Sequence, residues 1–259
     1  MKVVILCGGL GTRLKEETEY KPKPMVEVGG RPLLWHIMKG YSQFGYNQFV
    51  LCLGYKGNII RDYFINYDLR NNDFTLSLKD QGIAVHNRHE ESAWEITFAE
   101  TGPEAMTGAR IKKIEKYIDG DTFMLTYGDG VSDVNLNELL AFHKSHGKTA
   151  TITGVTPLSR FGELVAENNM VTQFNEKPKL HNKGLINGGF FIFSRKVFQY
   201  LSASDGCILE KQPLERLANE GELCVYEHRD FWQCMDTYRD FELLNQLWKE
   251  NKASWKTWK

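Results

Sequence analysis

The chain lacks any long hydrophobic run. None of its stretches approaches the roughly 18 consecutive apolar residues that a membrane-spanning helix needs. The apolar run near the start, residues 3–7, is also too short for the core of a signal peptide. These absences argue against a membrane protein and favour a cytoplasmic one.

Cysteine is scarce, and its spacing forms no recognisable pattern. The sequence has five cysteines, which lie far apart and include no CxxC pair: Cys7, Cys52, Cys207, Cys224 and Cys234. An odd number at such spacing argues against a disulfide framework or a zinc site and favours a reducing compartment. Cys7, Cys52 and Cys224 stand in apolar runs, where cysteine usually behaves as a small buried hydrophobe.

An excess of either charge is also missing. Lysine and arginine number 32 and aspartate and glutamate 33, which gives a formal net charge of -1. This balance excludes a global basic field that would collect nucleic acid, so any polyanion must be held by local groups. We find no internal repeat, low-complexity tract or flexible linker, and we expect a single domain over residues 1–259.

The hydrophobic pattern predicts an α/β fold. Short buried strands separated by helical patterns in the first third predict a mostly parallel sheet with helices on both faces. The expected strands are 3–6, 49–53, 74–78, 83–85, 96–99, 123–127, 150–155, 171–174, 189–193 and 223–226. The expected helices are 32–38, 59–67, 108–117, 136–146, 209–219 and 241–248.

A glycine-rich turn directly after the first strand carries the strongest chemical signal. Glycines allow a tight turn whose backbone N–H groups approach phosphate oxygens, and Arg13 adds a fork of donors suited to phosphate. Neither a P-loop nor a GxGxxG pattern is present, and an ordinary strand-end turn is the alternative explanation. The attached Thr12 and Arg13 make the run distinctive. The run reads Leu6, Cys7, Gly8, Gly9, Leu10, Gly11, Thr12, Arg13 and Leu14.

Lys23 lies between two prolines, ten residues after Arg13. Proline fixes the backbone dihedral φ, so Pro22 and Pro24 present this ammonium group from a stiff platform. A solvated lysine is the usual interpretation of any single lysine. The nearby glycine-rich turn favours a phosphate contact for Lys23.

Asp129 and Asp236 are candidate ligands for a hard cation. Mg²⁺ keeps several waters and takes one or two carboxylates together with substrate phosphates. Asp129 follows a predicted strand, at the edge where open α/β sheets bind ligands. The alternatives are a turn residue at Asp129 and a helix N-cap at Asp236, and for Asp236 the residues alone leave cap and ligand near even.

Taken together, these motifs resemble the sugar-1-phosphate nucleotidylyltransferases. The matches extend along the whole chain: Gly8 to Leu14, Lys21 to Met25, Tyr127 to Gly130, Glu176 to Pro178, Asn187 to Phe190, and Trp232 to Thr237. Met106 to Arg110, the Trp232 run and the tryptophan-rich tail resemble one branch of this family, the glucose-1-phosphate cytidylyltransferases. The resemblance implies a Rossmann-like fold, CTP and glucose 1-phosphate as substrates, Mg²⁺ as cofactor, and a homo-oligomer, specifically a hexamer. It also implies that the product feeds bacterial deoxysugar and lipopolysaccharide O-antigen synthesis. The balanced charge and the lack of long apolar runs argue against a nucleic-acid or membrane partner.

The resemblance assigns roles to particular residues. Arg13, Lys23, Asp129 and Asp236 would be catalytic, with Asp129 and Asp236 holding the metal. The substrate-binding set would be Leu6, Cys7, Gly8, Gly9, Leu10, Gly11, Thr12, Arg13, Lys23, Ala105, Thr107, Arg110, Gly128, Glu176, Lys177, Asn187 and Gly188. The nucleotide-binding part would cover about 1–130, the sugar-phosphate part about 131–240, and a helix and tail 241–259.

Two departures from the family pattern and three rival functions remain. Cys7 stands where the family loop usually has alanine, and Ala109 stands where glycine is common, which leaves the path from Thr107 to Arg110 open. The nearest rival is the same reaction with UTP or dTTP, and a non-catalytic nucleotide-sugar sensor is a second. A glycosyltransferase is disfavoured because no DxD metal pair follows Asp129. The histidine pairs His86/His89 and His143/His146 have no evident third ligand, so surface or core roles are favoured for them.

Overall fold

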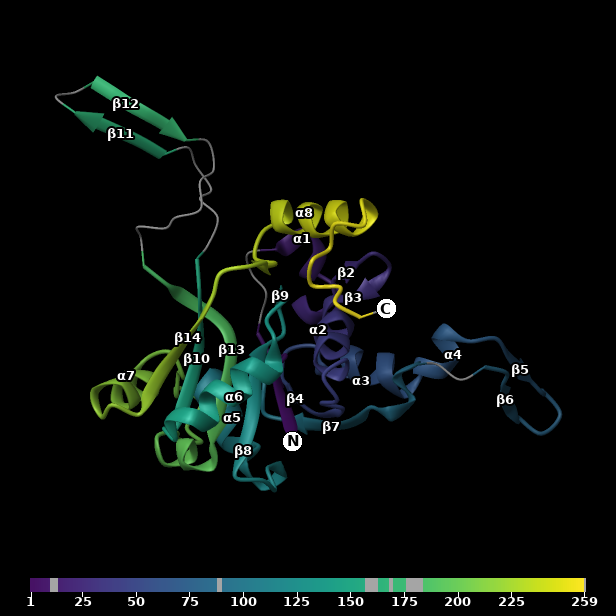
Figure 1. Ribbon diagram of the computed structural model, residues 1–259. Coiled ribbons are helices and arrows are strands. Elements are labelled where there is room, and N and C mark those ends of the chain that lie inside the picture. The colour runs from purple at the N-terminus through teal and green to yellow at the C-terminus, as the bar shows by residue number, and fades with distance from the viewer. Residues whose placement is uncertain (10–13, 88–89, 157–162, 168–169, 176–183, 259) are drawn as a thin grey trace.

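In the computed structural model, the chain folds around a mixed seven-stranded sheet (Figure 1). The structure describes residues 1–9, 14–87, 90–156, 163–167, 170–175 and 184–258. All strands run in one direction except β13, which is antiparallel to both of its neighbours, so the predicted mostly parallel sheet is confirmed. The strand order is β14 (Leu223–His228), β10 (Ala150–Val155), β13 (Ile186–Ser194), β8 (Thr122–Tyr127), β1 (Lys2–Leu6), β4 (Gln48–Leu53) and β7 (Glu95–Glu100).

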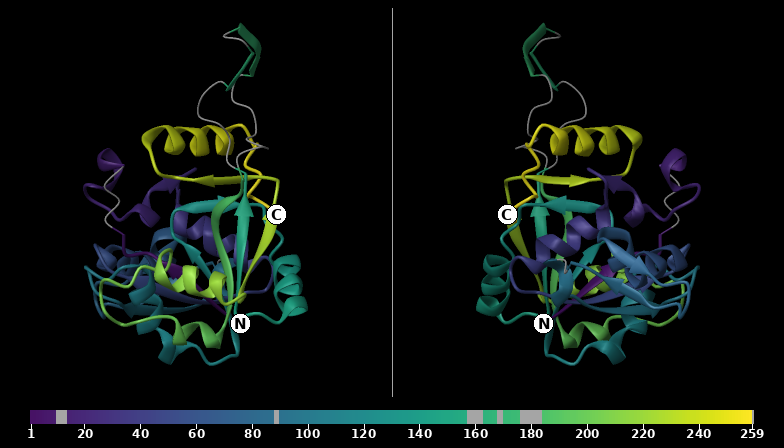
Figure 2. Two further views of the ribbon diagram at one scale, coloured as in Figure 1. Left: turned by 90° about the vertical axis from the view of Figure 1, so that its left-hand side faces the viewer. Right: turned by 90° about the vertical axis from the view of Figure 1, so that its right-hand side faces the viewer.

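Helices cover both faces of this sheet (Figure 2). Alternation along β1 sends Val3 and Ile5 into one core and Val4 and Leu6 into the other, because successive side chains of a strand point to opposite faces. The first core packs against α2 (Leu33–Ser42), α3 (Gly57–Ile65), α6 (Leu136–His146) and α8 (Tyr238–Lys249). The second packs against α5 (Thr107–Lys113), α7 (Gln212–Asn219) and η4 (Arg195–Gln199).

The segment after α8 packs into the first core. Trp255 is buried, and its indole N–H lies 3.4 Å from Nδ1 of His36 on α2. The other ring nitrogen of His36, Nε2, lies 2.8 Å from the carbonyl oxygen of Val28. Burial lowers the pKa of His36 from 6.5 to about 4, which favours a neutral ring that donates from Nε2 and accepts at Nδ1.

Several helices differ from the expected ranges for local reasons. The expected helix 59–67 is two helices, α3 and α4 (Tyr67–Asn71), because Asn66 leaves the helical region. The helix expected over 108–117 ends at Lys113 and continues as the 3-10 helix η3 (Glu115–Tyr117). The helix α7 begins at Gln212 rather than Leu209 because Pro213, which has no N–H to donate, occupies its first turn.

Short elements that the sequence pattern did not predict complete the body. They are α1 (Lys15–Thr18), η1 (Lys23–Met25), β2 (Glu27–Val28), β3 (Arg31–Pro32), η2 (Glu90–Ala93), β9 (Gly130–Ser132) and β15 (Trp232–Cys234). The strands β2 and β3 pair with each other, and β9 pairs with β15. None of the helices in the described ranges combines the length and apolar character that crossing a bilayer requires.

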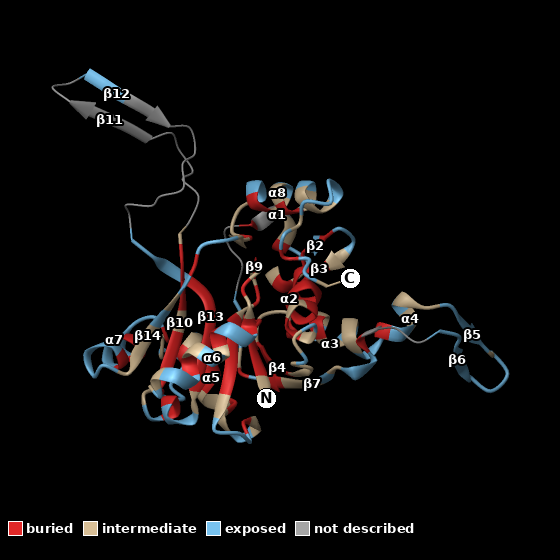
Figure 3. Ribbon diagram, viewed as in Figure 1, coloured by how far each residue is buried: buried red, intermediate tan, exposed pale blue. Residues whose placement is uncertain are grey.

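Two hairpins extend from the body. The hairpin of β5 (Phe74–Leu76) and β6 (Ile83–Val85) is exposed along its length (Figure 3). The hairpin of β11 (Glu163–Glu167) and β12 (Met170–Asn175) also stands apart from the sheet (Figure 1). The expected strand 74–78 ends at Leu76, and the expected strand 171–174 lies within β12.

The polar and sulfur-containing residues singled out in the sequence occupy ordinary structural positions. His143 is buried, and both His143 Nδ1 and His146 Nε2 lie 2.8 Å from the Thr151 hydroxyl, which is the hydrogen-bond partner of both rings. Within the described ranges, no group of three His, Cys, Asp or Glu side chains could hold a metal. Cys7 and Cys52 are buried as expected, but Cys224 is only half-buried because β14 is an edge strand.

Candidate functional site

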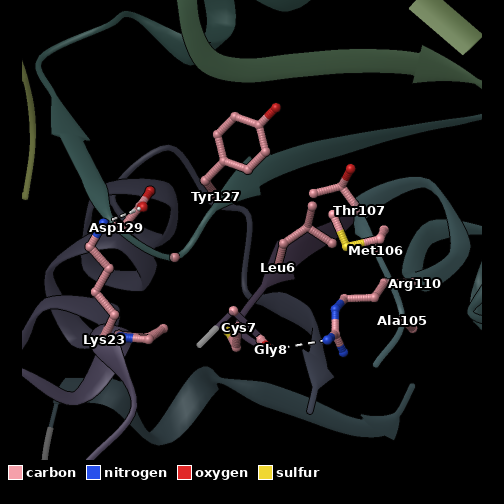
Figure 4. A pocket seen from close by; sticks show the side chains of 13 residues that line it. Leu6, Cys7, Gly8, Lys23, Ala105, Met106, Thr107, Arg110, Tyr127 and Asp129 are labelled. Atoms are coloured by element: carbon pink, nitrogen blue, oxygen red, sulfur yellow. Dashed lines mark hydrogen bonds and ion pairs between the residues drawn. The ribbon is translucent and has the colours of Figure 1, made fainter. Parts of the chain in front are cut away.

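A pocket opens at the carboxyl ends of β1 and β8, the adjacent parallel strands in the middle of the sheet (Figure 4). Cys7, Gly8 and Gly9 directly follow β1, and they line the pocket together with Tyr127 at the end of β8. The volume is about 290 Å³. We name this cavity the loop pocket; its lining is Leu6, Cys7, Gly8, Gly9, Lys23, Pro24, Ala105, Met106, Thr107, Arg110, Tyr127, Gly128 and Asp129.

A second pocket of about 280 Å³ adjoins the loop pocket, since Tyr127 and Asp129 line both. We name it the Asn187 pocket. Its wall includes the indole of Trp232, whose N–H donates to the carbonyl of Gly188 at 2.6 Å. The lining is Thr126, Tyr127, Asp129, Gly130, Asn187, Gly188, Gly189, Phe190, Trp232, Cys234 and Asp236.

The ammonium group of Lys23 lies between the two aspartates at the junction of the pockets. Its Nζ is 2.8 Å from Oδ2 of Asp129 and 2.5 Å from Oδ1 of Asp236. Burial alone would lower the pKa of Lys23. The two carboxylates have the larger combined effect, so the pKa lies above its ordinary value. Lys23 therefore stays charged, and the two acidic side chains lie within reach of one cation.

Pairing of two very short strands brings the aspartates together. Asp129 directly precedes β9, and Asp236 follows β15 by one residue; β9 and β15 pair antiparallel through Gly130 and Cys234. The N–H of Met235 donates to the carbonyl of Asp129 at 2.8 Å and fixes the two turns against each other. Lys23 reaches them from η1, where Pro24 is buried.

Of the two roles that the sequence left open for Asp236, the structure excludes the helix N-cap. The N-cap of α8 is Thr237, whose hydroxyl accepts from the N–H of Asp240, while the Asp240 carboxylate accepts from the N–H of Thr237. This capping box satisfies the start of the helix. The Asp236 carboxylate instead contacts Lys23.

Two converging carboxylates form a donor set that suits Mg²⁺. This hard cation prefers oxygen ligands, and it commonly uses only one or two carboxylates because waters and substrate phosphates supply the rest. Asp129 and Asp236 are both partly exposed, with 33% and 18% of their side-chain surfaces accessible, which leaves room for such ligands. The residues present therefore fit the cation that the sequence implied.

Arg110 contacts the segment that follows β1. The residue is only 4% exposed, and its Nη2 donates to the carbonyl of Gly8 at 3.0 Å. A Cβ at Gly8 would lie 2.3 Å from Cζ of Arg110, so a larger residue at this position would displace the guanidinium from its present place. The remaining acceptors for Nη1 and Nη2 are Leu53 O, Thr101 Oγ1, Gly102 O and Pro103 O.

The structure brings most of the expected site residues together. Ala105, Thr107 and Arg110 approach the loop pocket from α5 and the segment before it, and Ala109 is buried within that helix. Asn187 and Gly188 line the Asn187 pocket. The expected residues Leu10, Gly11, Thr12, Arg13, Glu176 and Lys177 lie outside the described residues.

Two wall residues, Tyr127 and Trp232, were not among the expected site residues. Tyr127 ends the strand β8 immediately before Gly128 and Asp129, and Trp232 opens β15 four residues before Asp236. Their proximity in sequence to the expected metal ligands is the signal that could have identified them.

The fold and site define the class of protein. Residues 2–236 match the nucleotidyl transferase family, and the chain belongs to that family. Within that family it is similar to glucose-1-phosphate cytidylyltransferases. The chain is 48% identical over 259 residues to the glucose-1-phosphate cytidylyltransferase of Salmonella typhi, covering 100% of both chains. It is 45% identical over 258 residues to the probable glucose-1-phosphate cytidylyltransferase of Bacillus subtilis, again covering 100% of both.

Solved structures share the fold. A structure of HddC from Yersinia pseudotuberculosis complexed with GMP-PN is 25% identical, with a TM-score of 0.67 and coverage of 95% of this chain and 99% of that one. A putative glucose-1-phosphate thymidylyltransferase from Bacillus anthracis has a TM-score of 0.70 at 18% identity, covering 95% of this chain and 94% of that chain. The expected nucleotidyltransferase fold is thereby confirmed.

Proposed function

We propose that this enzyme converts CTP and glucose 1-phosphate into CDP-glucose and pyrophosphate. The observation that carries the proposal is the junction of the two pockets, where Lys23, Asp129 and Asp236 meet. The loop pocket would hold CTP and the Asn187 pocket glucose 1-phosphate. Similarity over the full length to glucose-1-phosphate cytidylyltransferases supports this choice of nucleotide and sugar.

The reaction needs charge neutralisation and alignment more than proton transfer. A phosphate oxygen of the sugar 1-phosphate attacks the α-phosphorus of CTP, a new P–O bond forms, and the bond to the β-phosphate oxygen breaks, releasing pyrophosphate. The second pKa of a phosphate ester lies near ~6, so the nucleophile is already ionised at neutral pH. In agreement, no histidine lines either pocket among the described residues.

Different residues of the site would stabilise the charges of different phosphate groups. Lys23 would neutralise the α-phosphate, while the backbone of Gly8 and Gly9 would approach the phosphate chain. Asp129 and Asp236 would hold Mg²⁺, which supplies positive charge to the phosphate oxygens when bound. Arg13 at the leaving pyrophosphate and Lys177 at the sugar phosphate complete the proposed set.

Product analysis tests the proposal. The purified protein is incubated with glucose 1-phosphate, Mg²⁺ and either CTP, UTP or dTTP, and pyrophosphate and the nucleotide sugar are measured. We expect CDP-glucose as the main product. A preference for UTP or dTTP would reassign the nucleotide, and stabilisation by nucleotide without any pyrophosphate would indicate a sensor.

We further propose that the protein is a homo-oligomer, with a hexamer as the expected form. The β5–β6 hairpin supports this because it exposes five large apolar residues over 37% to 86% of their surface, and exposed apolar patches often mark protein–protein interfaces. These residues are Phe74, Leu76, Leu78, Ile83 and Val85. Light scattering of the wild type and of a Leu76→Lys/Ile83→Lys variant tests this; a wild-type monomer would contradict it.

A reducing, cytoplasmic location completes the proposal. All five cysteines lie within the described residues and are free thiols, as expected where disulfides do not form. The product would then serve the synthesis of deoxysugars for surface polysaccharide. Metabolite analysis of a strain lacking the gene tests this role, and unchanged CDP-glucose would contradict it.

A further inference from the structure

One carboxylate, that of Glu210, accepts hydrogen bonds from side chains of both pockets. The Thr107 hydroxyl donates to Oε2 at 2.6 Å, and the Tyr127 hydroxyl donates to Oε1. Thr107 lines the loop pocket, whereas Tyr127 lines both pockets. Figure 4 shows the two hydroxyl groups on the same side of the loop pocket. Glu210 itself lies outside both linings, in the segment before α7.

The directions of these hydrogen bonds are fixed by the groups beyond them. The Asn187 side chain donates to the Tyr127 hydroxyl at 3.2 Å, and the N–H of Leu209 donates to the Thr107 hydroxyl at 2.9 Å. Each hydroxyl oxygen thus accepts one bond and has its own proton available for Glu210. Burial, reinforced by the nearby Glu210 carboxylate, raises the pKa of Tyr127, so this phenol remains a donor.

The ring of Tyr127 is also held in place, by packing contacts. A Cβ at Gly189 would lie 2.6 Å from Cδ2 of Tyr127, and Gly189 also has a φ of +79°, so glycine is required there twice over. On another side the ring meets Phe191 edge-on, with centroids 5.8 Å apart. The Tyr127 ring therefore forms a fixed wall between the pockets. Glu210 links the hydroxyl of this ring to the hydroxyl of Thr107 by accepting a hydrogen bond from each.

We propose that Glu210 is a positioning residue that couples the two pockets. Holding Thr107 and Tyr127 at once, it sets the shape of the loop pocket and of the Asn187 pocket together. A substrate that orders one pocket then favours binding in the other, which is a coupling between sites. The identities of the two ligands rest on the proposed function.

The Glu210→Gln variant tests the coupling because glutamine has one acceptor oxygen where glutamate has two. Both hydroxyls are donors, so at least one loses its partner. Initial rates of pyrophosphate release over a grid of CTP and glucose 1-phosphate concentrations give both KM values. We expect both to rise about fivefold or more, the lower end of typical coupling between sites. The exposed Glu215→Gln on α7 is the matched control and should leave both values unchanged.

A second variant separates coupling from a purely structural role. In a Tyr127→Phe background, Glu210 has already lost its link to the wall between the pockets. Adding Glu210→Gln there should raise neither KM further, because only the Thr107 hydroxyl remains as a donor and the one acceptor oxygen of glutamine can serve it. The midpoint of thermal unfolding should stay that of the parent enzyme, because Glu210 is exposed.

Two results would overturn the coupling. In the first, Glu210→Gln leaves both KM values within about twofold of wild type, a change below the usual range of coupling between sites. In the second, Glu210→Gln raises the KM for glucose 1-phosphate equally with and without the Tyr127 hydroxyl. A wild-type protein that releases no pyrophosphate would instead contradict the proposed function. In that case, shifts of the unfolding midpoint with CTP, with glucose 1-phosphate and with both together measure the coupling without turnover. Additive shifts in the wild type would then refute it.

Discussion

Lys23 and Asp129 are 106 positions apart in the chain, yet Nζ of the lysine lies 2.8 Å from Oδ2 of the aspartate. The contact joins a proline-flanked turn to the end of a central strand, and the same ammonium group also meets Asp236. Opposite charges at this distance in a partly buried site interact strongly, so each member holds the others in place. The pair marks where the two substrates are expected to meet.

Removing either member should slow the reaction. We expect Lys23→Met and Asp129→Asn each to lower kcat/KM by about 10²-fold or more, the usual scale for a preorganised charge contact. Arg13→Ala should have an effect of the same size. Steady-state rates of pyrophosphate release measure the change, with the exposed Lys249→Met as control. Near-wild-type kinetics for Lys23→Met and Asp129→Asn would contradict the catalytic roles assigned to these two residues.

Arg110→Ala should weaken both the fold and the nucleotide preference. The change leaves buried carbonyl acceptors, including that of Gly8, without their donor, at a cost of about 1–3 kcal/mol for each unsatisfied group. We also expect the ratio of kcat/KM for CTP to that for UTP to fall, because the guanidinium can donate to N3 and O2 of cytosine but meets an N–H in uracil.

Urea unfolding and paired assays with CTP and UTP test the two effects of Arg110→Ala separately. The exposed Arg216→Ala is the control. An unchanged CTP preference would mean that Arg110 supports the loop without reading the base. In the structure, Nη1 and Nη2 already have acceptors within the chain, so a base would receive a hydrogen bond from them only in exchange for one of these.

Acid should destabilise the protein through His36. Its folded-state pKa of about 4 lies below its ordinary value of 6.5, so the unfolded chain takes up the proton first. The contribution of neutral His36 to the free energy of unfolding is fully present above pH 6.5. It is lost as the pH drops from 6.5 to 4, by roughly 3 kcal/mol in total.

Urea unfolding of the wild type and of His36→Gln at several pH values measures this effect. The variant should show a shallower loss of stability toward pH 4. It should not be flat, because burial also lowers the pKa of His143 to about 4. The exposed His86→Gln should retain the wild-type slope; an equally steep slope in His36→Gln would contradict the prediction.

The turn between β2 and β3 offers a matched pair of glycine variants. Gly29 and Gly30 both have positive φ, at 59° and 79°, so alanine at either position costs about 1–2 kcal/mol of backbone strain. A Cβ at Gly29 would also lie 2.0 Å from Nε1 of Trp248, whereas nothing lies within 4 Å at Gly30.

We expect Gly29→Ala to lose roughly 1–3 kcal/mol more than Gly30→Ala, the usual cost of overpacking. The difference between their free energies of unfolding in urea isolates the contact with Trp248. Equal losses would show that α8 can move away at little cost.

Much of the sheet could be predicted from sequence because its strands are short apolar runs. Residues 150–155 and the helix 136–146 match the structure at both ends. The pairing of β9 with β15 could not, since it depends on long-range contacts between segments of only three residues each. That pairing brings Asp129 to Asp236. The local sequence pattern does not indicate it, so the site was predicted from the family resemblance instead. The tie between Tyr127 and Glu210 was missed for the same reason.

The packing of Trp255 has a consequence for synthesis of the chain. It shares one core with Val3, so the environment of β1 cannot be completed until residue 255 has been synthesised. Contacts this distant in sequence slow folding and prolong exposure of apolar surface. The nascent enzyme should therefore depend on chaperones, and premature termination before Trp255 should yield products that are degraded.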